Sequence, residues 1–391
     1  MNQTDDPYDP FRQAREQSGT IDAEAGGVEF TMFLRHADLR RIAHDYSTFT
    51  SATPFRVPIP PEHDIRPTAQ LPIESDPPMH TAYRQLIDAR FSRPAMIRHE
   101  PATRALADTL LDAAISNGSM EVVGHYALPL FLHTLALVLG RPVSEVPRWS
   151  TWGVQALAAR DDGGAGVNTD LNAYIDDEVD EAIAAPGDDL FGDLATAIVD
   201  GRPLTRDEIR GFANLAFAGG RQTVVYALTN SIRHLADEPS ALAHLADDPS
   251  RIPVAIEEYL RFMTPITHLG RTATCDVSVG DQAVQTGDLV SLCFASANRD
   301  EAAFEHADQL RLDRRPNRHV AFGHGPHTCV GAPMARHVLR IALEQLVTRC
   351  ATLDLIDAVA HDEGIGGHQV RVGYDHLLVA LRSADVPMIT G

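Results

Sequence analysis

The stretch Phe322-Gly323-His324-Gly325-Pro326-His327-Thr328-Cys329-Val330-Gly331 places a single cysteine in a glycine-rich loop. The apolar stretch 332–346 follows directly, and its pattern predicts a helix. Glycines permit tight or left-handed turns and let the backbone approach a flat partner closely, while a proline stiffens the loop. The sequence therefore predicts a loop that presents the sulfur of Cys329 to a ligand.

The position of Cys329 before a predicted helix allows three interpretations. Backbone N–H groups at a helix N-terminus favour thiolate over thiol, and a thiolate is the axial ligand that directs haem iron toward O–O cleavage. Zinc could instead bind to the closely spaced His324, His327 and Cys329, although no second ligand pair with zinc-site spacing occurs elsewhere. A buried structural cysteine is the third interpretation.

A second informative segment runs from Thr205 to Asp237. It opens with the capping box Thr205-Arg206-Asp207-Glu208 and stops before Pro239, which predicts one helix of about 30 residues. Gly219-Gly220 lies near its middle, where each glycine costs about 1 kcal/mol relative to alanine. This pair indicates either room for a ligand or close packing against another helix, and the presence of Cys329 favours the ligand.

Together these segments resemble the cytochrome P450 family. Residues 322–331 match its haem-binding signature F-x-x-G-x-x-x-C-x-G at every fixed position. The resemblance implies a mainly α chain with small peripheral β-sheets, the cytochrome P450 fold, formed by residues 1–391 as a single haem domain. It also implies haem b as cofactor, with Cys329 as the metal ligand and Phe322 and Gly331 beside it.

The segment Ala218-Gly219-Gly220-Arg221-Gln222-Thr223 resembles the oxygen pocket in the central helix of that family. The resemblance implies that Gly219 and Thr223 line the oxygen site and that the Thr223 hydroxyl binds dioxygen and directs protons. Gln222 stands where most members have an acid, and it cannot ionise. Gln222 could orient a water chain, the enzyme could be poorly coupled, or hydrogen peroxide could replace the reductive step.

Further motifs of the family supply a structural network and ligands for the haem propionates. By resemblance, Glu258-Tyr259-Leu260-Arg261 is the E-x-x-R motif, and Arg314 completes a buried ion network with Glu258 and Arg261. Residues 76–84 resemble the D-P-P-x-H-x-x-x-R segment. The residues implied to bind the propionates are His80, Arg84, Arg271, His319 and His327.

The resemblance also indicates where a substrate would bind. It implies a pocket built from the loop 51–70, the central helix and the segment after the E-x-x-R helix, with Leu215, Ala218, Gly219, Thr267 and Leu269 as wall residues. These side chains are mostly small or apolar, which predicts a small lipophilic substrate such as a terpenoid or an aromatic compound. The implied reaction inserts one oxygen atom from O2 into a C–H bond of that substrate.

Electrons must reach the haem from another protein, because four scattered cysteines and no G-x-G-x-x-G turn exclude an iron–sulfur or flavin module. We expect a ferredoxin and its reductase, with the ferredoxin docking near Cys329 through basic residues such as Arg336 and Arg340. Two alternatives are a hydrogen-peroxide-dependent haem oxygenase (peroxygenase), motivated by Gln222, and a non-catalytic haem sensor or carrier.

Composition restricts the partners further. The 391 residues carry 33 Lys and Arg against 54 Asp and Glu, a net charge of −21, which repels nucleic acid and anionic membranes. The stretch 122–140 is apolar but contains His125, Pro129 and His133, so it predicts a buried core helix rather than a membrane span. Met1-Asn2-Gln3-Thr4-Asp5-Asp6 does not have the pattern of a signal peptide. We therefore expect a cytoplasmic monomer without nucleic-acid or membrane partners.

Short strands are expected outside the helical part. Alternating apolar residues predict strands at 274–279 and 288–294, joined by a turn at Gly280-Asp281, and two more at 369–372 and 377–381.

Overall fold

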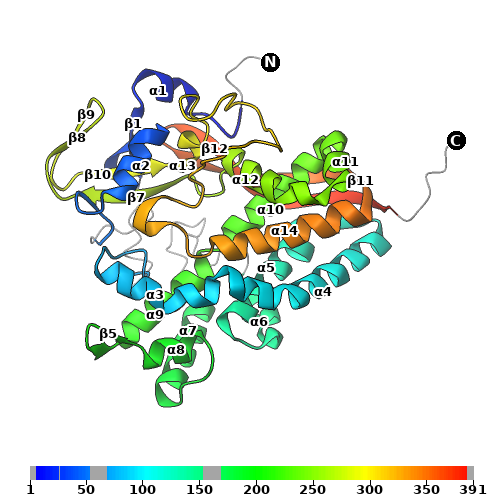
Figure 1. Ribbon diagram of the computed structural model, residues 1–391, viewed down its shortest axis with the longest axis horizontal. Coiled ribbons are helices and arrows are strands. Elements are labelled where there is room, and N and C mark those ends of the chain that lie inside the picture. Colours follow the sequence, from blue (N-terminus) through cyan, green and yellow to red (C-terminus); the bar gives the residue numbers. More distant parts are fainter. Residues whose placement is uncertain (1–5, 26, 53–67, 153–168, 385–391) are drawn as a thin grey trace.

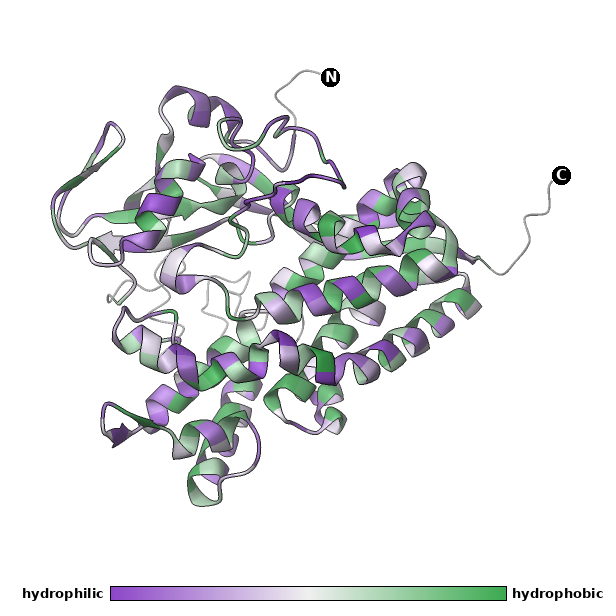
Figure 2. Cartoon of the chain, viewed as in Figure 1, coloured by the Kyte–Doolittle hydropathy of each residue, from purple (hydrophilic) through white to green (hydrophobic). Residues whose placement is uncertain are grey.

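The computed structural model describes residues 6–25, 27–52, 68–152 and 169–384, and helices make up most of this part of the chain (Figure 1). The helices are α1 (Arg12–Gln17), α2 (His36–His44), α3 (Met79–Phe91), α4 (Arg93–Asn117), α5 (Leu128–Leu139), α6 (Val146–Ser150), α7 (Thr169–Ala184), α8 (Leu190–Thr196), α9 (Arg206–Ala218), α10 (Arg221–Asp237), α11 (Pro239–Asp247), α12 (Ile252–Phe262), α13 (Phe294–Ala297) and α14 (Ala332–Arg349). Hydrophobic and hydrophilic residues alternate around α4 and α14, as expected for helices with one buried face (Figure 2). Within the described ranges, no helix combines the length and apolar composition needed to cross a membrane.

The strands form two main sheets at the periphery of the helices. The first has the order β1-β2-β10-β7-β3, with β1 (Thr20–Ala25), β2 (Val28–Phe33), β10 (Leu289–Cys293), β7 (His268–Ala273) and β3 (Phe49–Thr50). The second has the order β11-β12-β4, with β11 (Cys350–Ile365), β12 (His368–Ser383) and β4 (Ser119–Glu121). Two small hairpins complete the set: β5 (Ile198–Val199) with β6 (Arg202–Pro203), and β8 (Val277–Val279) with β9 (Gln282–Val284). The predicted fold class, mainly α with small sheets, is confirmed.

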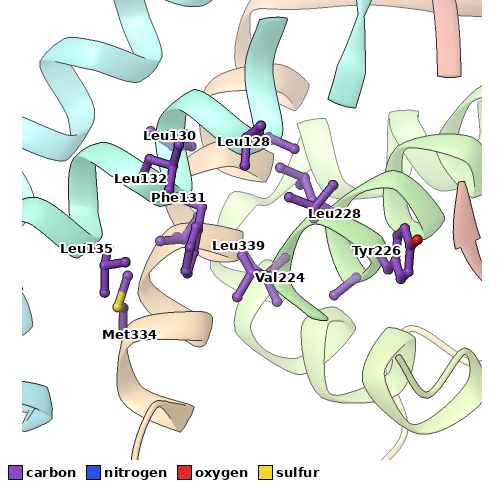
Figure 3. Close-up of a cluster of buried hydrophobic side chains, with 14 of the residues drawn as sticks. Leu128, Leu130, Phe131, Leu132, Leu135, Val224, Tyr226, Leu228, Met334 and Leu339 are labelled. Carbon is purple, nitrogen blue, oxygen red and sulfur yellow. The ribbon is translucent and has the colours of Figure 1, made fainter. Parts of the chain in front are cut away.

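The core of the helical part is formed by α5, α10 and α14. Nine of the twelve residues of α5 are buried, which follows from its being apolar on nearly every side. Figure 3 shows the side chains that meet there, among them Phe131 and Leu135 of α5, Val224 of α10, and Met334 and Leu339 of α14. Burial of a side chain of this size contributes about 1.5–3 kcal/mol. The predicted core helix at 122–140 is confirmed, although its first turn (Val123–Ala127) is π-helical.

The predicted single helix from Thr205 to Asp237 is wrong, because α9 ends at Ala218 and α10 begins at Arg221. The capping box of Thr205 and Glu208 does start α9. Between the helices, a Cβ on Gly220 would lie 2.8 Å from Cε2 of Phe131 on α5. Close packing against α5 therefore requires a glycine at position 220. Helix packing thus explains Gly220, one of the two glycines of the pair.

The C-terminal sheet is larger than the sequence predicts. Both β11 and β12 run for 16 residues and pair antiparallel, so the short strands expected at 369–372 and 377–381 are parts of one long strand. No strand was expected over 350–365, where exposed residues such as Asp354, Asp357 and Asp362 obscure the alternation of an edge strand. The turn at Gly280 joins β8 to β9 rather than to the strand at 289–293.

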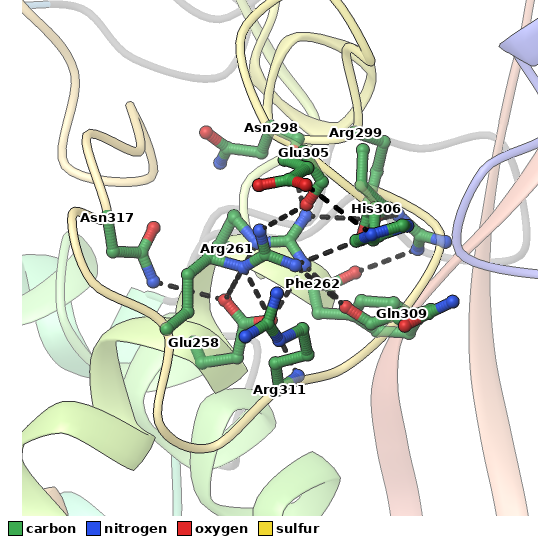
Figure 4. A network of polar contacts seen from close by, with 12 residues as sticks. Glu258, Arg261, Phe262, Asn298, Arg299, Glu305, His306, Gln309, Arg311 and Asn317 are labelled. Carbon is green, nitrogen blue, oxygen red and sulfur yellow. Dashed lines mark hydrogen bonds and ion pairs between the residues drawn. The ribbon is translucent and has the colours of Figure 1, made fainter.

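Glu258 and Arg261 lie together in a buried network of polar contacts (Figure 4), and buried Arg314 also belongs to it through its ion pair with Glu258. Two parallel hydrogen bonds of 2.8 Å join Arg261 to the Glu258 carboxylate, and Arg314 Nε lies 3.0 Å from both of its oxygens. The remaining guanidinium nitrogens donate to backbone carbonyls, for example those of Ala307 and Gln309. The network thereby fastens the segment 298–317 to α12.

Candidate active site

A cavity of about 640 Å³ lies between the cysteine loop 322–331, α3, the junction of α9 and α10, and the tip of the β11–β12 hairpin. Most of the residues proposed from the sequence line it: His80, Arg84, Leu215, Ala218, Gly219, Gln222, Thr223, Thr267, Leu269, Phe322, His327, Cys329 and Gly331. Gln70 lines the cavity as well, but most of the proposed pocket loop 51–70, residues 53–67, lies outside the described residues. The structure therefore brings together segments that lie far apart in the sequence.

The cysteine loop is held in shape by close backbone contacts. The N–H of Cys329 donates to the carbonyl of Phe322 at 2.8 Å, and Gly323 and Gly325 adopt the left-handed φ values of +73° and +72°. A Cβ on Gly325 would lie 2.6 Å from the carbonyl oxygen of Ala43 on α2. The glycine thus lets α2 pack against the loop, while the exposed surface of Cys329 faces the cavity.

The ionisation of Cys329 differs from the sequence expectation. The protein surrounds the thiol on every side except that of the cavity, and this burial raises its pKa, which the backbone N–H groups of Gly331 and Ala332 offset only in part. The helix N-terminus therefore acts in the predicted direction but does not by itself favour the thiolate. A coordinated metal cation would do so, because it deprotonates a bound thiol outright. Among the described residues, no group of three or more His, Cys, Asp and Glu side chains converges on a point, so the zinc alternative is not supported.

Four basic side chains gather beside this loop: His80, Arg84, Arg271 and His327. The rings of His80 and His327 lie 4.3 Å apart, and Arg84 donates to the carbonyl of Thr328 at 2.6 Å. Two carboxylates are near: Asp76 Oδ1 lies 4.0 Å from His327 Nε2, and Asp88 Oδ1 lies 2.6 Å from Arg84 Nε. Arg84 therefore has a carboxylate partner, whereas Arg271 has no ion pair in the described part of the chain.

The cluster is poorly satisfied within the described part of the chain. Nδ1 of His327 is buried without a hydrogen-bond partner, and buried Arg271 donates to the carbonyl of its neighbour Gly270 at 2.6 Å. Burial, with the charges of Arg271, His80 and Arg84, lowers the pKa of His327 to about 2, and burial lowers the pKa of Arg271 to about 10. Buried cations normally have anionic partners, so this arrangement fits an anionic ligand such as the two carboxylates of a haem.

The structure does not support the expected role of His319 as a propionate ligand. Its Nε2 lies 2.9 Å from Glu257 Oε2, and its Nδ1 accepts the N–H of Ala321 at 3.2 Å. Both ring nitrogens are therefore used, and His319 does not line the cavity. Glu257 also binds Arg336, and although burial opposes it, the Arg336 and His319 hydrogen bonds lower the pKa of Glu257 to about 2.

On the opposite side of the cavity, the turn between α9 and α10 carries the proposed oxygen site. Gly219, Gln222 and Thr223 all face the cavity. The hydroxyl of Thr223 lies 3.3 Å from the carbonyls of both Gly219 and Gly220, which are long contacts that leave it available to a ligand. The Gln222 amide donates to the hydroxyl of Tyr226 at 3.3 Å.

Sequence reasoning missed the polar part of the cavity wall. Glu363, near the tip of the hairpin, is the only carboxylate lining the cavity among the described residues. The hydroxyl of Thr267 donates to Glu363 Oε2 at 2.6 Å and lies 2.8 Å from Nδ1 of His268. Because Thr267 has one hydroxyl hydrogen, His268 Nδ1 must be the donor in the second contact. No local signal indicated Glu363, since β11 itself was not predicted.

The basic residues expected to dock a ferredoxin have partners within the chain. Arg336 binds Glu257 through two contacts of 2.7 Å, and Arg340 binds Glu100 at 2.6 Å. Two exposed arginines at the start of α4, Arg93 and Arg98, have no ion pair in the described part of the chain.

Comparisons with known proteins agree with this fold and site. The family model for Cytochrome P450 matches residues 189–353. The chain is 32% identical to the erythromycin C-12 hydroxylase of Saccharopolyspora erythraea, over 90% of this chain and 89% of the relative. It is 30% identical to the linalool 8-monooxygenase of Pseudomonas putida, over 89% of this chain and 90% of the relative. A solved structure described as a carbohydrate active P450 superposes with a TM-score of 0.92 at 39% identity, covering 96% of this chain and 98% of that one.

The chain therefore belongs to the cytochrome P450 family and has its fold. Its relatives include an epoxidase, a hydroxylase and a monooxygenase, and the chain is accordingly a cytochrome P450 monooxygenase. This result disfavours the alternative of a non-catalytic haem sensor or carrier.

Proposed function

We propose that the chain binds haem b in the cavity and that the sulfur of Cys329 would hold its iron. The observation that carries the proposal is a cysteine open to the cavity beside two buried groups that lack partners in the described part of the chain: Arg271, which has no ion pair there, and Nδ1 of His327, which has no hydrogen-bond partner there. His80, Arg84, Arg271 and His327 would bind the propionates, and Phe322 and Gly331 would lie against the cofactor. When bound, the haem supplies the chemistry that activates dioxygen.

The chain's own groups then position substrate and protons. Thr223 would offer its hydroxyl to the oxygen site, because that hydroxyl has only long contacts to the helix backbone. Gly219 would give room beside the helix, and Gln222 would act through its amide, since it cannot ionise. The network of Glu258, Arg261 and Arg314 has a structural role at a distance from the cavity.

For the substrate, we propose a small, largely apolar molecule that carries at least one hydroxyl group. Leu215, Ala218 and Leu269 would pack against its hydrocarbon part. Glu363 accepts one hydrogen bond from Thr267 and has no ion pair in the described part of the chain, so its carboxylate retains acceptor capacity for a donor from the substrate. The likeness to a carbohydrate active P450 and to a P450 in complex with erythromycin B supports a hydroxylated substrate.

An optical titration of the ferric haem-loaded protein tests the substrate class. Menthol and p-menthane share a carbon skeleton and differ by one hydroxyl, and methyl glucoside represents a carbohydrate. We expect Glu363→Gln to weaken the binding of hydroxylated ligands about 5- to 10-fold, the cost of one hydrogen bond, and to leave p-menthane unchanged. Asp362→Asn, which alters the adjacent carboxylate, is the matched control. Equal effects of Glu363→Gln on both members of the pair would contradict the hydroxyl contact.

We also propose that a ferredoxin and its reductase supply the electrons, in the cytoplasm, and that the ferredoxin docks at the start of α4. Arg93 and Arg98 are exposed and have no ion pairs in the described part of the chain, unlike Arg336 and Arg340. We expect Arg98→Glu to slow ferredoxin-driven reduction and to reduce its dependence on salt. Arg382→Glu is a suitable control, because the N–H of the neighbouring Leu381 donates to Gly118 at the far end of α4, about 30 Å from Arg98 at 1.5 Å per residue.

A peroxide-dependent reaction is the second candidate, because Gln222 replaces the usual acid of the family. Product formation with hydrogen peroxide alone is compared with formation by NADH, reductase and ferredoxin. A peroxide-driven rate that equals or exceeds the ferredoxin-driven rate would favour the peroxygenase. Rapid loss of the haem absorbance without product would favour the monooxygenase.

A further inference from the structure

A chain of hydrogen bonds links Gln222 in the cavity wall to the β11–β12 hairpin at the surface. Gln222 Nε2 donates to the hydroxyl oxygen of Tyr226 at 3.3 Å, and the Tyr226 hydroxyl donates to Asp375 Oδ1 at 2.8 Å. The other oxygen of Asp375 lies 2.9 Å from Nδ1 of His361. Tyr226 is fully buried, whereas Asp375 is exposed and His361 is half-buried. The chain of hydrogen bonds therefore begins at Gln222 in the cavity wall and ends at Asp375 and His361, which solvent can reach.

The direction of this chain is fixed by the number of hydrogens available. A carboxylate can only accept, so the single hydroxyl hydrogen of Tyr226 points to Asp375. The Tyr226 oxygen must then accept from Gln222, which requires the NH2 end of the amide to face Tyr226. The oxygen and the NH2 group of an amide differ in chemistry but hardly in shape, so the contact with Tyr226 decides which end of the Gln222 amide points away from Tyr226.

We propose that Asp375, acting through Tyr226, holds Gln222 with its carbonyl oxygen directed to the distal side of the cavity. Asp375 and Tyr226 are then positioning residues, and Gln222 offers the oxygen site a hydrogen-bond acceptor and no donor. An acceptor at this place would orient the hydrogen of a water molecule or of a neighbouring hydroxyl, as a carboxylate does, without supplying a proton. The inference rests on the proposed haem site at Cys329.

A merely structural role for the Asp375 contact is the rival explanation, in which it ties α10 to the hairpin. Other contacts already make that tie. Asn230 of α10 donates to the carbonyl of Val372 at 2.9 Å, and a Cβ on Gly373 would lie 2.4 Å from Cγ of Tyr226. The strand therefore packs against Tyr226 without help from Asp375, and we expect Asp375→Asn to fold with unchanged thermal stability.

The orientation of the amide can be measured with carbon monoxide as a probe of the reduced haem protein. A hydrogen-bond donor near the oxygen of bound carbon monoxide lowers its C–O stretching frequency, whereas an acceptor does not. We expect one infrared band in the unmodified protein, at a position that reflects the Thr223 hydroxyl but no donor from Gln222. The amide introduced by Asp375→Asn can donate as well as accept, so this substitution frees the Gln222 amide to turn, and a second band at lower wavenumber should appear.

Two variants separate the orientation of Gln222 from a general disturbance. In the double variant Gln222→Glu with Asp375→Asn, no amide donor exists at position 222, so the second band should disappear. Asp362→Asn removes a carboxylate of the same hairpin that binds Arg371 rather than Tyr226, and it should leave the single band unchanged.

Three results would overturn the orientation: a donor-shifted band in the unmodified protein that remains in Thr223→Ala, no new band in Asp375→Asn, or a new band that persists in the double variant. Failure to form the carbon monoxide complex at all would contradict the haem site instead. The two proposals therefore fail in distinguishable ways.

Discussion

The Glu258 network and the cluster around Arg271 both bury an arginine side chain, but among the described residues only the Glu258 network holds a carboxylate in ion-pair contact with its buried arginines. Glu258 binds two arginines at 2.8–3.0 Å, and backbone carbonyls accept the remaining guanidinium hydrogens. Arg271 and His327 have no such set of partners in the described part of the chain, and burial lowers the pKa of both. The Glu258 network needs no further ligand, whereas the incompletely satisfied groups Arg271 and His327 fit the proposed anionic ligand. Substitutions in the two clusters should therefore respond differently to the cofactor.

The largest effect is expected from Glu258→Gln. It leaves Arg261 and Arg314 as buried cations without a carboxylate, which should lower the free energy of unfolding by about 3–5 kcal/mol. Chemical denaturation measures the loss, and it should be equal with and without haem because the network contains no cofactor ligand. A loss that occurs only in the haem-bound protein would contradict the division into two kinds of cluster.

Arg271→Met should have opposite effects on the haem-free and the haem-bound protein. Without haem, removal of an unsatisfied buried cation should leave the free energy of unfolding unchanged or raise it by up to about 1–3 kcal/mol. With haem, loss of a propionate contact should speed haem dissociation about tenfold, as measured by transfer of haem to apomyoglobin. Equal destabilisation of both states would show that Arg271 is structural.

A buried histidine without an ion pair in the described part of the chain should make the stability of the protein depend on pH. His337 of α14 lies 3.4 Å from the Thr103 hydroxyl, and burial, with Arg340 opposed by Glu100, lowers its pKa to about 4. The unfolded chain, in which histidine has a pKa of about 6.5, binds the proton first as pH falls. His337 should therefore cost the fold about 1–2 kcal/mol between pH 7 and pH 5.

The measurement is the difference between the unmodified protein and His337→Gln, obtained by denaturation at several pH values. The unmodified protein should lose more stability than the variant as pH falls from 6.5 toward 4. Parallel pH profiles would remove His337 as the cause.

The smallest effect is expected from an ion pair at the surface. Arg233 and Asp237 of α10 form a contact of 2.7 Å with four-residue spacing, similar in length to those of the Glu258 network. Because water screens both side chains, Arg233→Gln should change the free energy of unfolding by about 0.5 kcal/mol or less. A loss comparable to that of Glu258→Gln would mean that distance, rather than burial, decides the contribution of an ion pair.

The sequence by itself determined the features that are encoded in continuous segments. The loop 322–331 carries its cysteine and its glycines in one short stretch, so the candidate metal ligand could be proposed from it and the backbone turns at its glycines could be predicted. The helix start at Thr205 and the pairing of Glu258 with Arg261 were likewise predictable, because a cap and an i, i+3 pair depend on neighbours along the chain. The family and its fold followed from the order of these segments.

The tertiary structure alone decided which distant side chains meet. Glu257 binds His319 away from the cavity, Phe131 presses against Gly220 where the long helix breaks, and the hairpin brings Glu363 to the cavity and Asp375 to Tyr226. The partners in these contacts are between 62 and 149 residues apart, and a local pattern carries no information on which segments pack together. Packing sets the partner of each polar group, and the partner sets its charge, its orientation and its role.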